Sequence, residues 1–262
     1  MNRRTLTELA ANPDLICGIY NYCDRWCERC SFTTRCLLYA TEQEDADDFP
    51  ESRDIENAAF WEKLSRIFCE AKEMITEWAQ EAGVDLTEVD EEAVKTHRER
   101  HDAAARHTLA LAGKKYAEAV TEWFREFSET ITARDLPPDA DDQEQSQQFE
   151  DATDIIHWYQ YQIAVKIMRA LSSRSDELDE MEDPDFDPLR KDSDGSAKVA
   201  LVGVDRSISA WRLMQVAVPE RAESVVPLIL QLEQLRRRAE REFPDARAFL
   251  RPGFDEILGE PN

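Results

Sequence analysis

The chain has 262 residues, of which 42% are hydrophobic, enough to form the core of one large or two small domains. Its formal net charge of −24 at pH 7 repels phosphate backbones and anionic lipids, so nucleic acid and membranes are not expected as partners. Glycine is scarce, with only 7 residues, which disfavours turn-rich β architectures and favours helices.

Charge divides the chain into two parts. Residues 1–40 hold five arginines and four acidic residues, a net charge of +1, so residues 41–262 carry −25. The division predicts a cysteine-rich segment that binds a metal or cluster over 1–40 and an acidic helical bundle over 41–262. The sequence has no long apolar stretch that would direct export or cross a membrane, so we expect a cytoplasmic protein. In that reducing compartment, clustered cysteines are more often metal ligands or redox groups than structural disulfides.

Five of the six cysteines lie within 20 residues near the N-terminus. Four of them, Cys23, Cys27, Cys30 and Cys36, follow a C-x3-C-x2-C-x5-C pattern. Thiolates this close in sequence can surround one ion or cluster at a small cost in loop-closure entropy. Interleaved arginines favour thiolates and offset the negative charge of a four-thiolate site. The sequence therefore predicts a metal centre at these four cysteines, with Cys17 as a spare or alternative ligand.

The cofactor stays undecided between an iron–sulfur cluster and zinc. A compact group of cysteines is commoner for clusters, whereas zinc sites more often use two separated pairs, which favours the cluster slightly. A competing hypothesis is purely structural: Cys23, Cys27 and Cys30 also have the spacing of one helical face and would then be small buried hydrophobes. Their C-x3-C-x2-C spacing resembles that of the radical S-adenosylmethionine enzymes. The resemblance ends at these three residues, and no family is assigned.

After the cysteines, the chain predicts an all-α fold, an antiparallel helical bundle of four to five long helices. Apolar residues recur at helical spacing in five stretches, with Gly83 ending the first and Gly113 as a point of division in the second. The stretches are 54–82, 87–136, 149–171, 196–217 and 219–243. The first is expected to bury its apolar face, with Cys69 in the core. Acidic stretches predict mobile linkers near 41–54, 135–148 and 175–196, and the C-terminal segment is expected to pack as an irregular arm.

Two histidine groups are weaker metal candidates. Glu150, Asp154 and His157 share one helix face, and carboxylate-x-x-His is half of the ligand set of a ferritin-like di-metal bundle. No other stretch supplies the second half, so a polar helix flank is the preferred interpretation. His97 and His101 are four residues apart, but their charged surroundings predict a solvated face.

Asp205 and Arg206 interrupt the most apolar helical stretch. Buried charges need partners, so we expect an interhelical salt bridge in preference to a binding pocket.

The patterns support three functions. The first is a metal-dependent helical protein in which an iron–sulfur cluster has a redox or sensing role. The second is a binding or scaffold module pinned by structural zinc, with a protein partner or a homo-oligomer. The third is a ferritin-like di-metal oxidase. The sequence has no phosphate-cradling glycine loop and no nucleophile elbow, so no reaction is specified.

Overall fold

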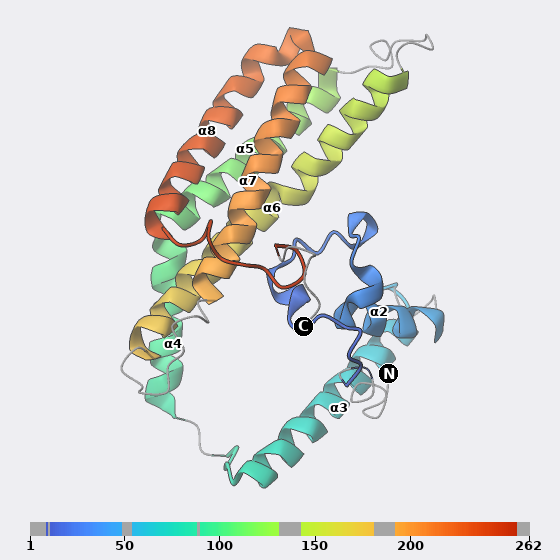
Figure 1. The fold of residues 1–262 in the computed structure, drawn as a ribbon, viewed down its shortest axis with the longest axis vertical. Helices are drawn as coiled ribbons and strands as arrows, with labels where there is room; N and C mark the ends of the chain where they lie inside the picture. The colour runs from blue at the N-terminus through green and yellow to red at the C-terminus, as the bar shows by residue number, and fades with distance from the viewer. Residues whose placement is uncertain are drawn as a thin grey trace. The chain divides into compact units, whose positions relative to one another are not determined.

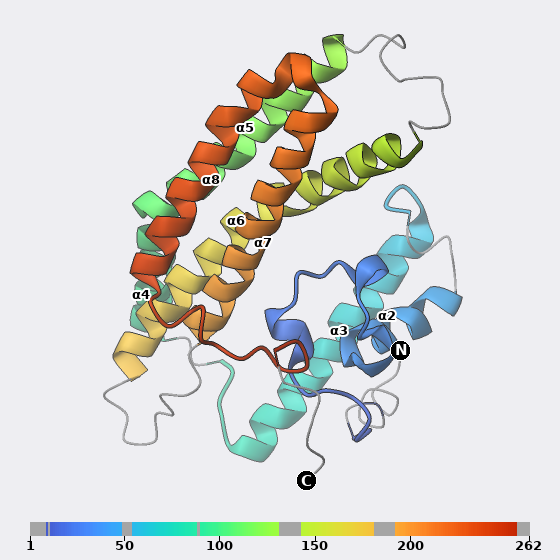
Figure 2. The ribbon, with the colours of Figure 1, turned by 45° about the horizontal axis from the view of Figure 1, so that its top comes forward.

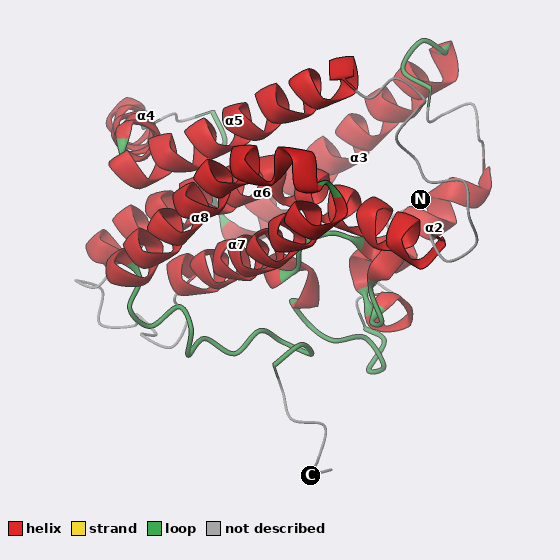
Figure 3. Ribbon diagram, turned by 90° about the horizontal axis from the view of Figure 1, so that it is seen from above, coloured by secondary structure: helices red, strands yellow, loops and turns green. Residues whose placement is uncertain are grey.

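The computed structural model describes residues 9, 11–48, 54–87, 90–130, 143–180 and 192–255 (Figure 1). The regular structure of these residues is entirely helical, which confirms the all-α prediction, and Figure 3 draws no strand among them. No helix in this part of the chain is long and apolar enough to cross a membrane. The α-helices are α2 (Leu37–Asp48), α3 (Ala58–Ala82), α4 (Glu91–Arg106), α5 (Thr108–Thr130), α6 (Gln143–Glu180), α7 (Asp192–Ala217) and α8 (Ala222–Glu242). The 3₁₀ helices are η1 (Ile19–Tyr22), η2 (Cys27–Arg29), η3 (Thr33–Arg35) and η6 (Pro219–Arg221).

The chain divides into two compact units. Unit 1 comprises Met1–Asn21, Arg25–His97 and Pro252–Asn262, and unit 2 comprises Tyr22–Asp24 and Arg98–Arg251. The boundary falls inside α4. One bundle of all the long helices is therefore not confirmed, because α3 belongs to unit 1 whereas α5 to α8 belong to unit 2.

Unit 2 contains almost all of the buried core. Its helix α5 packs against α6 and α8, and α7 packs against the same two helices (Figures 1 and 2). Of the 33 buried hydrophobic residues in the described chain, 31 lie in this unit, so only Ile19 and Ala79 are left for unit 1. Trp211 and Tyr116 are fully buried, and the indole N–H of Trp211 donates to the Tyr116 hydroxyl at 2.9 Å.

Two glycines allow the helices of unit 2 to approach closely. A Cβ on Gly113 would lie 3.2 Å from the Cα of Ala164, so α5 and α6 pack nearly backbone to backbone. The predicted division at Gly113 is therefore wrong: α5 runs through it, and the break falls at His107, whose Nδ1 accepts from the Leu109 amide. A Cβ on Gly203 of α7 would lie only 2.8 Å from the Tyr159 ring of α6.

Helix α3 begins and ends as local chemistry requires, but it does not bury its apolar face. The Asn57 side chain accepts from the Ala59 amide at the N-terminus, and Gly83 ends the helix at a φ of 69°, as predicted. The large apolar side chains on one face are 40–67% exposed, and Cys69 is exposed as well. Both expectations of burial for this helix are wrong. Apolar periodicity identifies such a face without identifying what covers it.

The acidic stretches contain more helix than expected. Residues 41–48 of the first stretch form most of α2. Helix α6 starts at Gln143 and continues to Glu180, and α7 starts at Asp192, so both overlap the other two stretches. Glutamate is a good helix former, and acidic side chains on a solvated face do not stop a helix. Residues 49–53, 135–142 and 181–191 of these stretches lie outside the described residues.

Candidate metal centre

The cysteine segment is built from short 3₁₀ helices and turns. Between residues 11 and 36 there is no α-helix among the described positions, only η1, η2 and η3. Gly18, with a φ of 72°, and Arg25, with a φ of 59°, turn the chain where a continuous helix would run. The hypothesis that Cys23, Cys27 and Cys30 share one face of an amphipathic helix is therefore wrong.

The cysteines occupy the ends of these short elements. Cys27 starts η2 and Cys30 ends it, with the Cys30 amide donating to the Cys27 carbonyl at 3.2 Å. Cys36 ends η3 and precedes α2. Cys17 is exposed, whereas these three and Cys23 are half-buried thiols. Cys23 belongs to unit 2 and the others to unit 1. The described residues include no group of three or more His, Cys, Asp or Glu side chains placed to hold a metal ion.

One sulfur atom accepts a backbone hydrogen bond. The Phe32 amide donates to Cys30 Sγ at 3.4 Å, a contact that orients the sulfur as a ligand. The three arginines interleaved with these cysteines have other contacts within unit 1. They are the ion pair of Arg25 with Glu42 at 2.8 Å, the Arg29 guanidinium 4.3 Å from the Trp26 ring centre, and the bond from Arg35 Nε to the Asp14 carbonyl at 3.2 Å. That these arginines offset the negative charge of the thiolates stays a prediction.

A small apolar cluster holds the segment together. The Ile16 amide donates to the Arg35 carbonyl at 2.9 Å, which closes the segment into a loop, and Ile19 is 2% exposed. Gly253, with a φ of 76°, packs so closely that a Cβ there would lie 2.8 Å from Ile16 Cδ1. The Phe254 ring lies 5.0 Å from the Phe32 ring. The C-terminal arm is irregular as far as residue 255, where the described chain ends, and Gly253 and Phe254 complete this cluster.

In unit 2, Asp24 is held by four side chains that we call the Asp24 clamp. Its carboxylate accepts from Arg206 Nη1 at 2.6 Å and from the Tyr159 hydroxyl, and Arg206 also donates to that hydroxyl. The Asp24 carbonyl accepts from Trp158 Nε1 at 2.9 Å and from the Gln162 side chain. Three of these partners are on α6 and one is on α7, so the two helices fix the residue that follows Cys23.

The residue that precedes Cys23 is anchored as well. The Tyr22 ring lies 4.7 Å from the Phe249 ring and fills the space above Gly195, where a Cβ would lie 2.3 Å from it. Burial, together with the charge of Asp192, raises the pKa of Tyr22 to about 12. Burial and the Asp24 carboxylate likewise raise the pKa of Tyr159. A phenol is protonated at neutral pH even at its ordinary pKa of about 10, so both hydroxyls are able to donate there.

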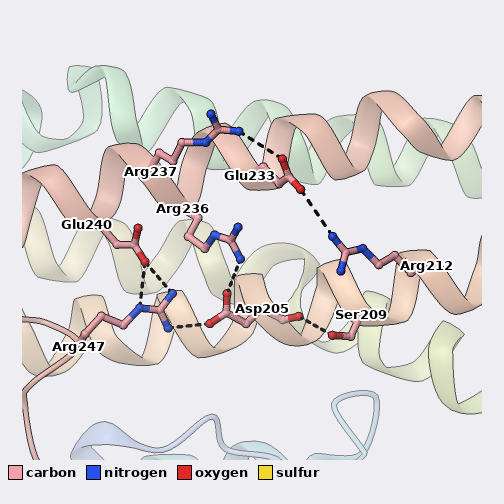
Figure 4. Close-up of polar contacts among 8 residues, drawn as sticks. All are labelled: Asp205, Ser209, Arg212, Glu233, Arg236, Arg237, Glu240 and Arg247. Carbon is pink, nitrogen blue, oxygen red and sulfur yellow. Dashed lines mark hydrogen bonds and ion pairs between the residues drawn. The ribbon is translucent and has the colours of Figure 1, made fainter.

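Asp205 forms the interhelical salt bridge that the sequence predicts. Its carboxylate accepts from Arg236 of α8 at 3.3 Å and from Arg247, in the segment after α8, at 2.6 Å (Figure 4). Arg247 also contacts Glu240, which links the two helices a second time. The expected burial is wrong, because the Asp205 and Arg206 side chains are 39% and 53% exposed.

The three candidate histidines lie at the surface of their helices. His157 is exposed and stacks on Phe124, with ring centres 4.1 Å apart. His97 and His101 are exposed on α4, as a solvated face requires.

The chain matches no protein-family model, no curated protein and no solved structure. Three features of the molecule point to a function: the cysteine segment, the Asp24 clamp and the exposed face of α3. The clamp is the feature that sequence reasoning missed, because its partners lie 134 to 182 residues from Asp24. The only signal for it was Arg206, an arginine in an apolar helix.

Proposed function

We propose that this chain is a metal-binding helical protein in which Cys23, Cys27, Cys30 and Cys36 hold one iron–sulfur cluster or zinc ion. The iron–sulfur form, with a redox or sensing role in the cytoplasm, is the preferred version. The observation that carries the proposal is the contrast between the units. Unit 1 has two buried hydrophobic residues among its described positions, and its cysteine segment consists of short turns. Small segments with so little core usually depend on crosslinks or a metal.

The magnitudes favour a metal as the missing stabilisation. Full burial of one large apolar side chain contributes about 1.5–3 kcal/mol, and Ile19 is the one such residue that is buried among the described positions of unit 1. Binding of a structural zinc ion by four cysteine or histidine ligands contributes about 10–16 kcal/mol. A cysteine-ligated metal would therefore outweigh the segment's own packing several-fold.

The contacts of the described residues support different roles for two of the proposed ligands, Cys23 and Cys30. Cys23 lies between Tyr22 and Asp24, both of which are anchored to unit 2. Cys30 accepts an amide hydrogen bond of the kind that orients thiolate ligands. A bound iron–sulfur cluster would supply one-electron transfer, whereas zinc would supply a crosslink without redox chemistry.

The test is metal content with matched cysteine variants. The protein is purified anaerobically, and iron, acid-labile sulfide, zinc and visible absorbance are measured. Each of Cys23→Ser, Cys27→Ser, Cys30→Ser and Cys36→Ser is expected to lower metal occupancy at least about tenfold. Cys17→Ser and Cys69→Ser are the controls, because both thiols are exposed and lie outside the predicted ligand set. Equal occupancy in all six variants, or a wild-type protein without metal, contradicts the proposal.

The same measurements separate the alternatives. Iron with stoichiometric sulfide supports the redox or sensing role, whereas one zinc ion in a colourless protein supports a scaffold module. If instead His157→Ala removes metal while the cysteine variants keep it, the ferritin-like di-metal alternative replaces both.

A further inference from the structure

Among the described residues, the apolar face of α3 is the largest group of exposed apolar side chains on one element. Its six large members lie between 40% and 67% exposed. They are Trp61, Ile67, Phe68, Met74, Ile75 and Trp78. Their spacing places all of them on one side of a 25-residue helix, about 37 Å long. Apolar faces of this extent on a water-exposed helix mark sites of association.

The order of residues along this face is nearly the same in both directions. If two copies of α3 lie antiparallel about a two-fold axis near Cys69, Trp61 lies opposite Trp78. In the same register Leu64 lies opposite Ile75, and the large Phe68 ring lies opposite the small Ala71. Large side chains then meet at the two ends, and a large one meets a small one at the centre, as interdigitated packing requires.

The distribution of charge along α3 favours the same antiparallel orientation. The first part of the helix has a net charge of +1, from Glu62, Lys63 and Arg66. The rest has a net charge of −3, from Glu70, Lys72, Glu73, Glu77 and Glu81. Antiparallel pairing places the positive end beside the negative end of the other copy, whereas parallel pairing places like charge beside like charge. Lys63 and Glu77 lie on the same side of the apolar face and become neighbours across the two-fold axis.

We propose that α3 is a dimerisation helix that pairs antiparallel with α3 of a second copy of this chain. A second copy fits better than an unrelated partner because the face is complementary to itself in shape and in charge. Each copy carries −24, so the attraction must come from this local face against the repulsion between the two bodies. The proposal does not depend on the metal centre.

The first test is the mass of the full-length protein in reducing buffer, measured by light scattering and sedimentation equilibrium. The wild type is expected to be a dimer, and Phe68→Glu is expected to weaken it at least about tenfold. Val165→Glu is the matched control, because Val165 is 62% exposed on α6 of unit 2. Far-UV circular dichroism checks that each variant keeps the wild-type helix content. A wild type that stays monomeric at about 100 µM overturns the proposal, as does a Phe68→Glu variant that dimerises like the wild type.

The second test addresses the antiparallel arrangement by charge reversal. Lys63→Glu and Glu77→Lys are each expected to weaken the dimer by about tenfold, because each creates two like-charge contacts. An equimolar mixture of the two variants restores two opposite-charge contacts and is expected to form a heterodimer of wild-type strength. If the mixture dimerises no better than either variant alone, the antiparallel register is wrong. Metal content is measured on the same samples, so a failed metal proposal is distinguishable from a failed dimer.

Discussion

The hydroxyl of Tyr159 shows how one buried polar atom connects distant parts of the sequence. It lies in the core of unit 2 and donates to a carboxylate 135 residues earlier in the chain. Burial disfavours the phenolate, and the Asp24 charge disfavours it further, so the pKa of Tyr159 is raised. A raised phenol pKa contributes stability that is present below the ordinary value of about 10 and is lost as the pH rises above it.

Replacement of Tyr159 by phenylalanine removes this donor while keeping the ring. We expect Tyr159→Phe to lower the free energy of unfolding by about 1–2 kcal/mol, because the Asp24 carboxylate loses the hydroxyl donor of Tyr159. Urea denaturation followed by circular dichroism measures the loss. Tyr161→Phe is the control: Tyr161 is 59% exposed on the same helix, and its change is expected within about 0.5 kcal/mol. Equal losses in the two variants would mean that the Tyr159 bond contributes nothing of its own.

At the scale of the helices, glycine decides how closely α6 and α7 approach. Gly203 faces the Tyr159 ring, and the hydrogen bonds of the Asp24 clamp hold that ring in place. A methyl group at this position would overlap the ring, with 2.8 Å between carbon centres. The short separation of the two helices therefore depends on a residue that lowers the helix propensity of α7.

Gly203→Ala sets two effects of opposite sign against each other. Alanine increases helix propensity by about 1 kcal/mol, whereas overpacking costs about 1–3 kcal/mol and displaces Tyr159 from Asp24. We expect net destabilisation, measured as a lower urea midpoint with an unchanged m-value. Ser209→Ala is the control, because Ser209 is exposed on the same helix and its replacement gains propensity without overlap. A Gly203→Ala variant at least as stable as the wild type would show that the ring moves at no cost.

The sequence predicted which residues form helices, but it did not predict what packs against each helix. The 3.6-residue periodicity of α3 and the signal of Gly83 at its end identify a helix from local chemistry alone. Burial of the face depends on partners that periodicity does not contain, so the same pattern misled for Trp61 and Trp78. At Gly113 the local signal was wrong because of packing. A glycine suggests a break in the helix, but here it lets the backbone of α5 approach Ala164 of α6.

At the candidate site, the features set by neighbouring residues were predictable from the sequence, whereas contacts between distant residues were not. The close spacing of Cys23 to Cys36 is visible in the sequence, and so is its suitability for metal binding. The helical spacing of the same cysteines suggested a helix, but the backbone turns at Gly18 and Arg25 instead. The partners of Asp24 were hidden, because Tyr159 and Arg206 are brought to it only by the packing of α6 against α7.

At the scale of the whole molecule, the uneven core predicts that this protein unfolds in more than one step. Buried apolar area is the main source of stability, and among the described residues 31 of the 33 buried hydrophobic ones lie in unit 2. Proteins with separate cores or bound metals commonly unfold in more than one step. Unit 1 is therefore expected to unfold first, unless metal or a second copy stabilises it.

Urea denaturation with two probes tests this order. Three tryptophans lie in each unit, so a Trp26→Phe, Trp61→Phe, Trp78→Phe variant keeps tryptophan fluorescence only in unit 2. With a chelator and at low protein concentration, circular dichroism of this variant is expected to fall in two steps, and fluorescence is expected to report only the second.

Metal restored at about 100 times its dissociation constant stabilises the folded site by about 2.7 kcal/mol. Three of the four proposed ligands belong to unit 1, so this stabilisation is lost when unit 1 unfolds. It should therefore shift the first step to higher urea and leave the second unchanged. Coincident single transitions by both probes, with and without metal, would contradict an unfolding order set by the uneven core.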